Sequence, residues 1–241
     1  MEGLLTEQLC KSYPGRKKKN FPVLNHVSIH LEPGSFTSLV GESGCGKSTL
    51  ARILTGLEAP DSGRILLDGK DATHWRQKDW RPQRRRLQAV FQDASGTLNP
   101  ALSAYHNVEQ ALLNLTDLTR HQRRERIESL MSRTDMDPGL LKTPVRLLSG
   151  GEQRRLSLLR AISIRPAYLI LDEVLSGLDL ICADTVMSLL KQYHREYHGT
   201  VLLITHDMDS AYRLSGKIYR MQNGQIVREG INTNLKGNNE L

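Results

Sequence analysis

A glycine-rich segment in the first third of the chain carries the strongest chemical signal. Residues 41–48 read Gly-Glu-Ser-Gly-Cys-Gly-Lys-Ser and match the pattern G-x-x-x-x-G-K-[ST] at every fixed position. Glycines let successive backbone N–H groups point into one concavity, where phosphate oxygens meet the positive end of a helix dipole. Lys47 would add a charge near the β- and γ-phosphates, and Ser48 would ligate Mg²⁺. The pattern predicts an ATP and Mg²⁺ site formed by Gly41, Ser43, Gly44, Cys45, Gly46, Lys47, Ser48 and Thr49.

A second set of candidate residues ends an apolar segment much later in the chain. Residues 168–171 are predicted to form a buried strand, which is followed by Asp172 and Glu173. Asp172 could hold the Mg²⁺ shell while Glu173 polarises the water that attacks the γ-phosphate. Taken alone, an acidic pair after an apolar strand is equally typical of carboxylates that merely cap a strand end.

The elements needed to position these residues are visible in the hydrophobic pattern. An apolar run at 36–40 precedes the glycine-rich segment, and residues 48–57 are predicted to be helical, so that segment lies at a strand-to-helix junction. Residues 99–147 have leucines at helical spacing and predict a helical insertion. Afterwards the pattern predicts strand 168–171, helix 184–193 and strand 201–205, which is an α/β alternation.

Composition limits the class of protein. The 241 residues contain 39% hydrophobic and 24% charged residues, as in ordinary globular domains. No apolar run approaches the roughly 20 residues that cross a bilayer, and the N-terminus does not resemble a signal peptide. Three scattered cysteines fit a reducing compartment, so a cytoplasmic location is expected. The net charge of +7 would suit nucleic acid, a phosphorylated ligand or an anionic membrane surface, although the basic runs at 16–19 and 84–86 lack interleaved aromatics.

One further motif connects the two sets of residues to a family. Residues 148–153, Leu-Ser-Gly-Gly-Glu-Gln, resemble the LSGGQ signature of ABC ATPases, with Glu152 in place of the usual Gln. Four other positions fall in the order of that family: Tyr13 as the adenine-stacking aromatic, Gln92 as the Q-loop, Asp179 at the end of the D-loop, and His206 as the switch histidine. This resemblance covers nearly the whole chain.

The resemblance implies a fold and a mechanism. The fold would be an α/β P-loop NTPase core (1–98 and 148–230) with an N-terminal antiparallel β subdomain, an inserted α-helical subdomain (99–147) and a loose tail (231–241). Two such domains would face head to tail. Ser149, Gly150 and Gly151 would then contact ATP held by the partner, while His206 and Glu173 position the attacking water. Gln92 would join Ser48 and Asp172 around Mg²⁺, partly through water, and pass closure on to a membrane partner.

The kind of ABC ATPase is indicated by residues 90–100, which look like the Q-loop region of oligopeptide, dipeptide and nickel importers. The short C-terminal part and residues 172–179 look more like the second ATPase subunit of nickel or metal-chelate importers. This implies a peripheral subunit on the cytoplasmic face of the membrane, with a second ABC ATPase subunit in a heterodimer, two transmembrane permease subunits and an extracytoplasmic substrate-binding protein. A peptide importer and a soluble ABC protein that binds nucleic acid remain the alternatives.

Two other groups of residues were considered. His194 and His198 stand four apart on a predicted helix, a spacing that can chelate a metal, but no third ligand is visible and a solvated helix face explains them better. Trp75 and Trp80 flank a polar segment and are predicted to be packing anchors.

Overall fold

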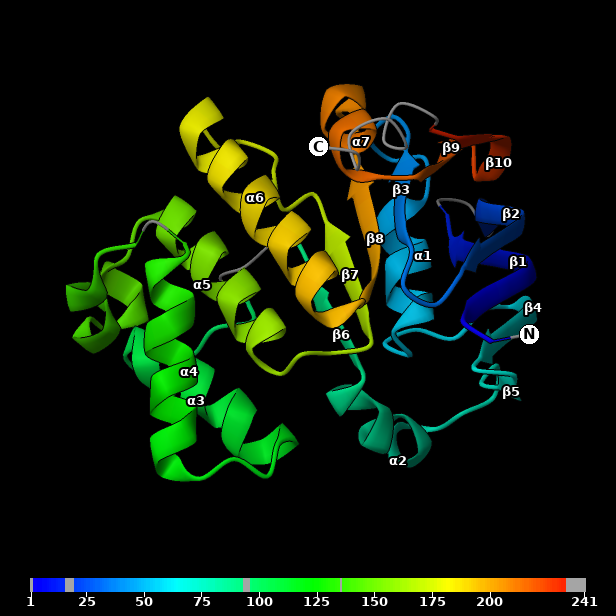
Figure 1. Ribbon diagram of the computed structural model, residues 1–241. Coiled ribbons are helices and arrows are strands. Elements are labelled where there is room, and N and C mark those ends of the chain that lie inside the picture. The colour runs from blue at the N-terminus through cyan, green and yellow to red at the C-terminus, as the bar shows by residue number, and fades with distance from the viewer. Residues whose placement is uncertain (1, 16–19, 93–95, 135, 233–241) are drawn as a thin grey trace.

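Two β-sheets and a cluster of helices make up the molecule (Figure 1). The computed structural model describes residues 2–15, 20–92, 96–134 and 136–232. A four-stranded antiparallel sheet has the order β2-β1-β4-β5, and a six-stranded sheet has the order β10-β9-β3-β8-β7-β6. The antiparallel sheet consists of β1 (Leu4–Pro14), β2 (Asn20–Leu31), β4 (Ser62–Leu67) and β5 (Lys70–Asp71). The six-stranded sheet consists of β3 (Phe36–Val40), β6 (Leu87–Val90), β7 (Tyr168–Asp172), β8 (Thr200–Thr205), β9 (Lys217–Gln222) and β10 (Gln225–Ile231).

The centre of the larger sheet is parallel and fully buried. Strands β3, β8, β7 and β6 pair in parallel, and every residue of β3, β7 and β8 is buried. Strands covered on both faces tend to have continuous apolar sequences, which explains why apolar and polar residues do not alternate in these strands. The carboxyl ends of β3 and β7 lead into residues 41–47 and Glu173, so both chemical motifs leave the same edge of the sheet.

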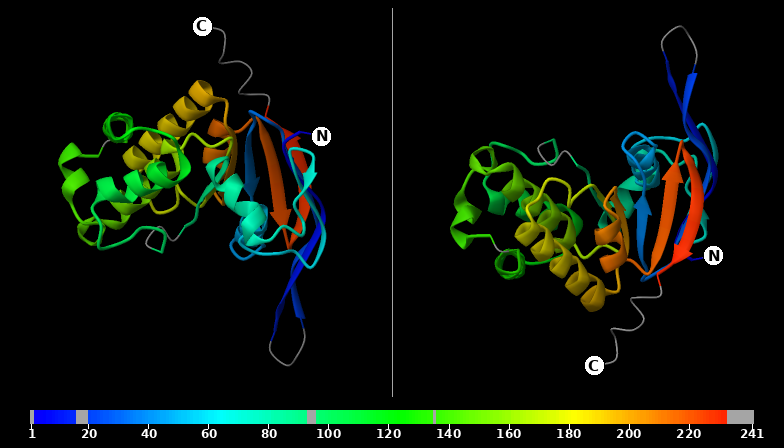
Figure 2. Two further views of the ribbon diagram at one scale, coloured as in Figure 1. Left: turned by 90° about the horizontal axis from the view of Figure 1, so that it is seen from below. Right: turned by 90° about the horizontal axis from the view of Figure 1, so that it is seen from above.

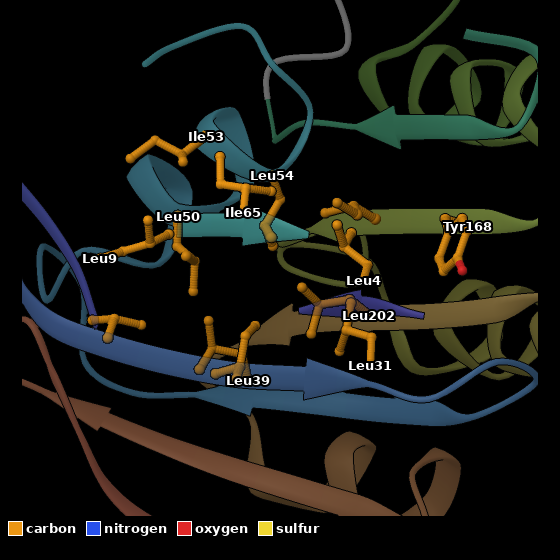
Figure 3. Packing of buried hydrophobic residues seen from close by; sticks show 14 of the residues in the cluster. Leu4, Leu9, Leu31, Leu39, Leu50, Ile53, Leu54, Ile65, Tyr168 and Leu202 are labelled. Atoms are coloured by element: carbon orange, nitrogen blue, oxygen red, sulfur yellow. The ribbon is translucent and has the colours of Figure 1, made fainter. Parts of the chain in front are cut away.

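Two hydrophobic clusters cover the two faces of this sheet. One cluster joins the antiparallel sheet, α1 (Lys47–Leu54) and alternate residues of the central strands, among them Leu39, Ile170 and Leu202 (Figure 3). The other joins Leu169, Leu171 and Leu203 to α5 (Gly150–Ser163), α6 (Leu180–Tyr197) and α7 (Met208–Leu214). Successive strand residues point to opposite faces, so one short strand supports both clusters.

The segment between β6 and β7 contains the helical insertion, which lies to one side of the sheets (Figures 1 and 2). It contains α3 (Ala104–Leu115), α4 (Arg120–Ser132) and the 3₁₀ turns η3 (Pro138–Lys142) and η4 (Val145–Leu147). Ser103 caps α3, and Thr119 caps α4 through a reciprocal capping box with Gln122. Leu118 lies between α3 and α4, although its spacing from Leu115 had suggested helix. The short α2 (Gln77–Trp80) and η2 (Arg81–Arg85) lie between β5 and β6.

Other boundaries differ from the sequence-based expectations. Helix α6 begins at Leu180 and ends at Tyr197, so it is longer at both ends than the predicted 184–193. Asp179 caps its start by accepting from the N–H of Cys182, and His198, with a φ of 49°, forms its C-cap. Ile231 ends β10, and the Asn232 amide donates to the carbonyls of Tyr212 and Ser215, so these two residues belong to the folded body rather than to a loose tail. The rest of the predicted tail, 233–241, lies outside the described residues. Within the described ranges no helix has both the length and the apolar character to span a membrane.

Candidate nucleotide-binding site

The glycine-rich loop connects β3 directly to α1. Gly44 and Gly46 have φ values of 80° and 112°, which favour glycine, and Gly46 forms the N-cap of α1. A Cβ on Gly41 would lie 2.4 Å from the carbonyl oxygen of Met221, so only glycine fits against β9 at that point. The loop therefore has the tight curvature that lets backbone N–H groups surround an anion at a helix start.

Lys47 is held close to this loop. Its side chain is buried, and its ammonium donates to the carbonyls of Gly41 at 2.7 Å and Glu42 at 2.9 Å. The same ammonium lies 3.9 Å from Oε1 of Glu173. A lysine charge is thus available at the point where the loop meets the end of β7, which suits phosphate binding.

Asp172 is suited to a divalent cation. It is 2% exposed, and its Oδ1 has no hydrogen-bond partner among the described residues. Burial raises the pKa of this carboxyl, while a hydrogen bond with Ser48 acts in the opposite direction. An orphaned buried carboxylate oxygen next to a hydroxyl provides the hard oxygen ligands that Mg²⁺ prefers. When bound, Mg²⁺ would neutralise charge on the phosphates, with Asp172 and Ser48 holding it.

Glu173 and His206 come together although 33 positions separate them in the chain. The Nδ1 of His206 lies 2.9 Å from Oε2 of Glu173. An ionised carboxylate only accepts hydrogen bonds, so Nδ1 donates and Nε2 stays free to face a ligand. Glu173 has a φ of 54°, unusual for a residue other than glycine, and its N–H donates to the carbonyl of Ile204. This pairing fixes the direction of a carboxylate that can accept a proton from water.

Two hollows flank the loop. The smaller, of about 190 Å³, is lined by Gln92, Glu173, Lys47 and Ser48 together with Gly46 and Thr49. The larger, of about 880 Å³, runs along the loop past Phe21 and Cys45 to His206. Val23, Ser43 and Gly44 line both hollows. The predicted loop residues, Gln92, Glu173 and His206 therefore surround one continuous region.

Tyr13 is placed differently from the sequence-based expectation. Its hydroxyl donates to Oε2 of Glu58 at 2.7 Å, and of the described aromatic residues Phe21, not Tyr13, lines the larger hollow. Tyr13 and Phe21 are paired across β1 and β2, and Phe21 is 64% exposed. Residues directly opposite in an antiparallel pair share a face. Both rings thus lie on one face of the hairpin, and the adenine-stacking role of Tyr13 stays a prediction.

The signature segment lies away from these hollows within this chain. Ser149 caps α5 and forms a capping box with Glu152, whose carboxylate accepts from the backbone N–H of Ser149 at 2.7 Å. A Cβ on Gly150 or Gly151 would meet no atom within 4 Å. In the described part of the chain, nothing packs closely enough to require glycine at these two positions. A molecule that comes close to this surface would give a reason for them. Asp179 likewise uses its carboxylate to cap α6, which lowers its pKa.

The turn between β9 and β10 was not identified from the sequence as part of the site. The Gly224 N–H donates to the carbonyl of Cys45 at 3.1 Å, and its carbonyl accepts from the N–H of Asn25 at 2.8 Å. Asn223 and Gly224 both have positive φ, as in a tight hairpin turn. The Asn-Gly pair predicts such a turn, but only the fold shows that it supports the glycine-rich loop.

The remaining candidates form no ligand site. The Nδ1 of His194 donates to the carbonyl of Gly199, His198 follows the end of α6, and the described residues contain no group of three metal-ligating side chains. Trp75 and Trp80 pack edge to face with centroids 5.2 Å apart, as predicted for packing anchors.

Comparisons with known proteins agree with this geometry. A family model described as ABC transporter matches residues 24–176. The chain is 36% identical over 230 residues to a probable peptide ABC transporter ATP-binding protein, y4tS, of Sinorhizobium fredii, covering 93% of this chain and 65% of that protein. It is also 36% identical over 215 residues to the nickel import ATP-binding protein NikE of Escherichia coli, covering 89% and 80%. The chain thus spans just under two thirds of the length of y4tS.

Solved structures give the same result. The dimeric ATP-binding cassette MJ0796, bound to ADP and phosphate, superposes with a TM-score of 0.88 at 27% identity, covering 95% of this chain and 98% of that one. CbiO1 from Clostridium perfringens, part of an ABC transporter complex CbiONQ, gives 0.80 at 28% identity over 100% and 93%. The chain belongs to the ABC transporter family, of which it forms an ATP-hydrolysing cassette. The family resemblance and the predicted fold class are thereby confirmed.

Proposed function

We propose that this cassette powers the import of nickel or another metal chelate. The pairing of Glu173 with His206 beside Lys47 and the orphaned Asp172 oxygen carries the hydrolytic part of the proposal. The similarity to a nickel import subunit, together with residues 90–100, supports the cargo class. Hydrolysis would supply the free energy, and the cargo would never touch this chain.

In the proposed mechanism the glycine-rich loop and Lys47 hold the β- and γ-phosphates of ATP. Glu173 accepts a proton from the attacking water, and His206 orients the Glu173 carboxylate through Nδ1. Asp172, Ser48 and Gln92 would hold Mg²⁺, which would neutralise charge on the phosphates. Tyr13 or its cross-strand neighbour Phe21 contacts the adenine from the β1–β2 hairpin, which projects from the body (Figure 2).

The open signature glycines support a head-to-tail pair of cassettes. Ser149, Gly150 and Gly151 would contact ATP on the partner, and Asp179 would lie at the same interface. We expect the partner to be a second, different ABC ATPase subunit. Two transmembrane permease subunits and an extracytoplasmic substrate-binding protein complete the proposed complex, with this chain peripheral on the cytoplasmic face of the membrane.

The competing cargo is a peptide, because y4tS is equally similar in sequence. Nucleic acid binding has less support. In the basic run 84–86, Arg84 donates to the carbonyl of Thr55, Arg85 pairs with Asp117, and Arg86 pairs with Asp68. These guanidiniums are engaged within the fold and do not form a free phosphate-binding patch. The run at 16–19 lies outside the described residues.

The test is ATP hydrolysis by the complete complex in vesicles. Its binding protein would be supplied empty, loaded with a Ni²⁺ chelate, or loaded with short peptides. Stimulation by the Ni²⁺ chelate alone is expected, and the complex carrying Glu173→Gln in this chain should show none. Stimulation by peptide alone would transfer the proposal to peptide import. Hydrolysis that responds to neither cargo would refute the importer assignment.

A further inference from the structure

A second cavity lies among the helices and shares no lining residue with the hollows beside the phosphate loop. It is bounded by α4, the C-terminal end of α5 and the second half of α6, which run close together in Figure 1. Its volume of about 320 Å³ lies at the lower end of the range for small-molecule pockets. The cavity therefore lies between the helical insertion and the core.

Two guanidinium groups that line this cavity, those of Arg126 and Arg165, have no carboxylate partner in the described part of the chain. Arg126 donates one N–H to the carbonyl of Ser163 at 3.1 Å. The guanidinium of Arg165 lies over the ring of Tyr197, 4.5 Å from the ring centroid. Neither forms an ion pair with any described residue, whereas Arg133 at the same cavity is paired with Glu196 at 3.1 Å.

The two charges also disfavour one another. Burial, and then the nearby charge of Arg165, lower the pKa of Arg126. Two cations that line one cavity are relieved by an anion between them, and a guanidinium offers paired N–H donors that match a carboxylate or phosphate. Of the two carboxylates at the cavity, Glu196 binds Arg133, and the largely exposed Glu125 lies 3.3 Å from His121.

The remaining lining is mixed. Leu118 and Leu130 contribute half-buried aliphatic surface, whereas Ile162 and Leu189 are almost fully buried, and Gln122, Ser129 and Gln192 add polar groups. The hydroxyl of Tyr193 donates to the carbonyl of Pro166 and is not free. A bare inorganic ion would leave this surface wet. An anion with an attached apolar group would cover it and gain from its burial.

We propose that this cavity binds a small organic anion, in which a carboxylate or phosphate is held between Arg126 and Arg165 and an apolar group lies against Leu118 and Leu130. Such a ligand contacts α4 of the insertion and Arg165 of the core together. It therefore stabilises one relative placement of the two parts, and this conclusion does not depend on the transported cargo.

The test uses phenyl phosphate and benzoate as probes, by titration calorimetry on the full chain with its phosphate loop saturated by Mg-ADP. At least one probe should bind at one site per chain. The Arg126→Gln/Arg165→Gln variant should bind at least about ten-fold more weakly, equivalent to about 1.4 kcal/mol. Arg124→Gln is the matched control, because Arg124 lies on the exposed face of the same helix and pairs with Glu128; its binding should be unchanged.

A second readout locates the site independently of affinity. Probe binding should shift the ring resonances of Tyr197 in the NMR spectrum of tyrosine-labelled protein, and Arg165→Gln alone, which removes no hydrogen bond from a described residue, should reduce that shift. No binding of either probe, or equal binding by the double variant, would overturn the proposal. Inorganic phosphate that binds as tightly as phenyl phosphate would overturn the role given to the apolar surface.

Discussion

At the residue scale, the proposed mechanism assigns the proton-accepting role to the Glu173 carboxylate. It follows β7 in an unusual backbone conformation and is 9% exposed. One of its oxygens is hydrogen-bonded to His206, and the other lies 3.9 Å from Lys47. Strained conformations persist when surrounding contacts fix them, and here the N–H of Glu173 is bonded to β8. These two partners come from distant parts of the chain, Lys47 in α1 and His206 just after β8, so the local sequence shows the acid but not its orientation.

Glu173→Gln tests this role. An amide cannot accept the proton of the attacking water, so turnover should fall by roughly 10²–10⁴-fold, while ATP binding by the intact phosphate loop is retained. Phosphate release and nucleotide binding would be measured on the complete complex. Glu128→Gln on α4 is the control and should hydrolyse ATP normally. A Glu173→Gln complex with ordinary turnover would remove Glu173 from the mechanism.

Asp172→Asn tests the metal site. Because burial raises the pKa of Asp172, its charged form opposes folding at neutral pH, and this cost disappears as pH falls through the raised pKa. The asparagine variant should therefore melt at a Tm equal to or above that of the wild type without Mg²⁺. It should also lose most of the additional stabilisation that Mg-ATP gives over ATP alone. An undiminished Mg²⁺-dependent rise in Tm would exclude Asp172 as a ligand.

At the element scale, the sequence predicts the motifs better than it predicts the turns and strands that hold them in place. The phosphate loop and the end of β7 could be predicted because each is a short segment whose residue types state its chemistry. The β9–β10 turn could not be placed, since its contacts with Cys45 and Asn25 join segments that are far apart in the sequence. The same holds for Phe21, which enters the site only because β2 pairs with β1.

Gly224→Ala tests the support given by this turn. Gly224 has a φ of 75°, and a Cβ there would lie 2.5 Å from the carbonyl oxygen of Val23. We expect a loss of about 1–3 kcal/mol in the free energy of unfolding and weaker ATP binding, as the loop loses its contact. Gly230→Ala in β10 is the matched control, because its Cβ would meet nothing within 4 Å. Equal ATP affinity in the two variants would show that the turn does not position the loop.

Asp68 joins the antiparallel sheet to the core. Its carboxylate accepts from the hydroxyl of Tyr168 in β7 and from Arg86 at 2.6 Å. Burial pushes its pKa upward, but the hydrogen bonds from Tyr168 and Arg86 outweigh this and hold the pKa below 3.8. The ionised form is therefore favoured more in the folded state than in the unfolded one.

The resulting pH dependence has a definite sign. The stabilisation from Asp68 is fully present above the ordinary carboxyl pKa of 3.8 and is lost as pH falls through the lower folded-state value. Asp68→Asn should lose about 1–3 kcal/mol at neutral pH, measured by urea unfolding, and the difference from the wild type should shrink in acid. A difference that is constant with pH would show that the charge of Asp68 is irrelevant.

At the scale of the whole molecule, the residues proposed for hydrolysis line one side of the hollows beside the phosphate loop. The chain presents an exposed signature segment with two glycines that its own described packing does not require. A partner cassette placed head to tail would bring its own signature segment over the ATP bound to this chain. The signature segment of this chain would in turn lie over the ATP bound to the partner. The sequence contained the signature motif, but a single chain cannot show what the motif contacts.

Gly151→Asp in this chain, measured within the complete complex, tests this arrangement most directly. The substitution fits the open space around Gly151 and adds an acid to the first turn of α5, where it favours the helix. The isolated chain should therefore keep its Tm and its own ATP affinity, while the added carboxylate repels the phosphates of ATP on the partner. We expect turnover by the complex to fall at least about ten-fold, with Gly151→Ala much less affected. Unchanged turnover with Gly151→Asp would contradict a site completed by a second cassette.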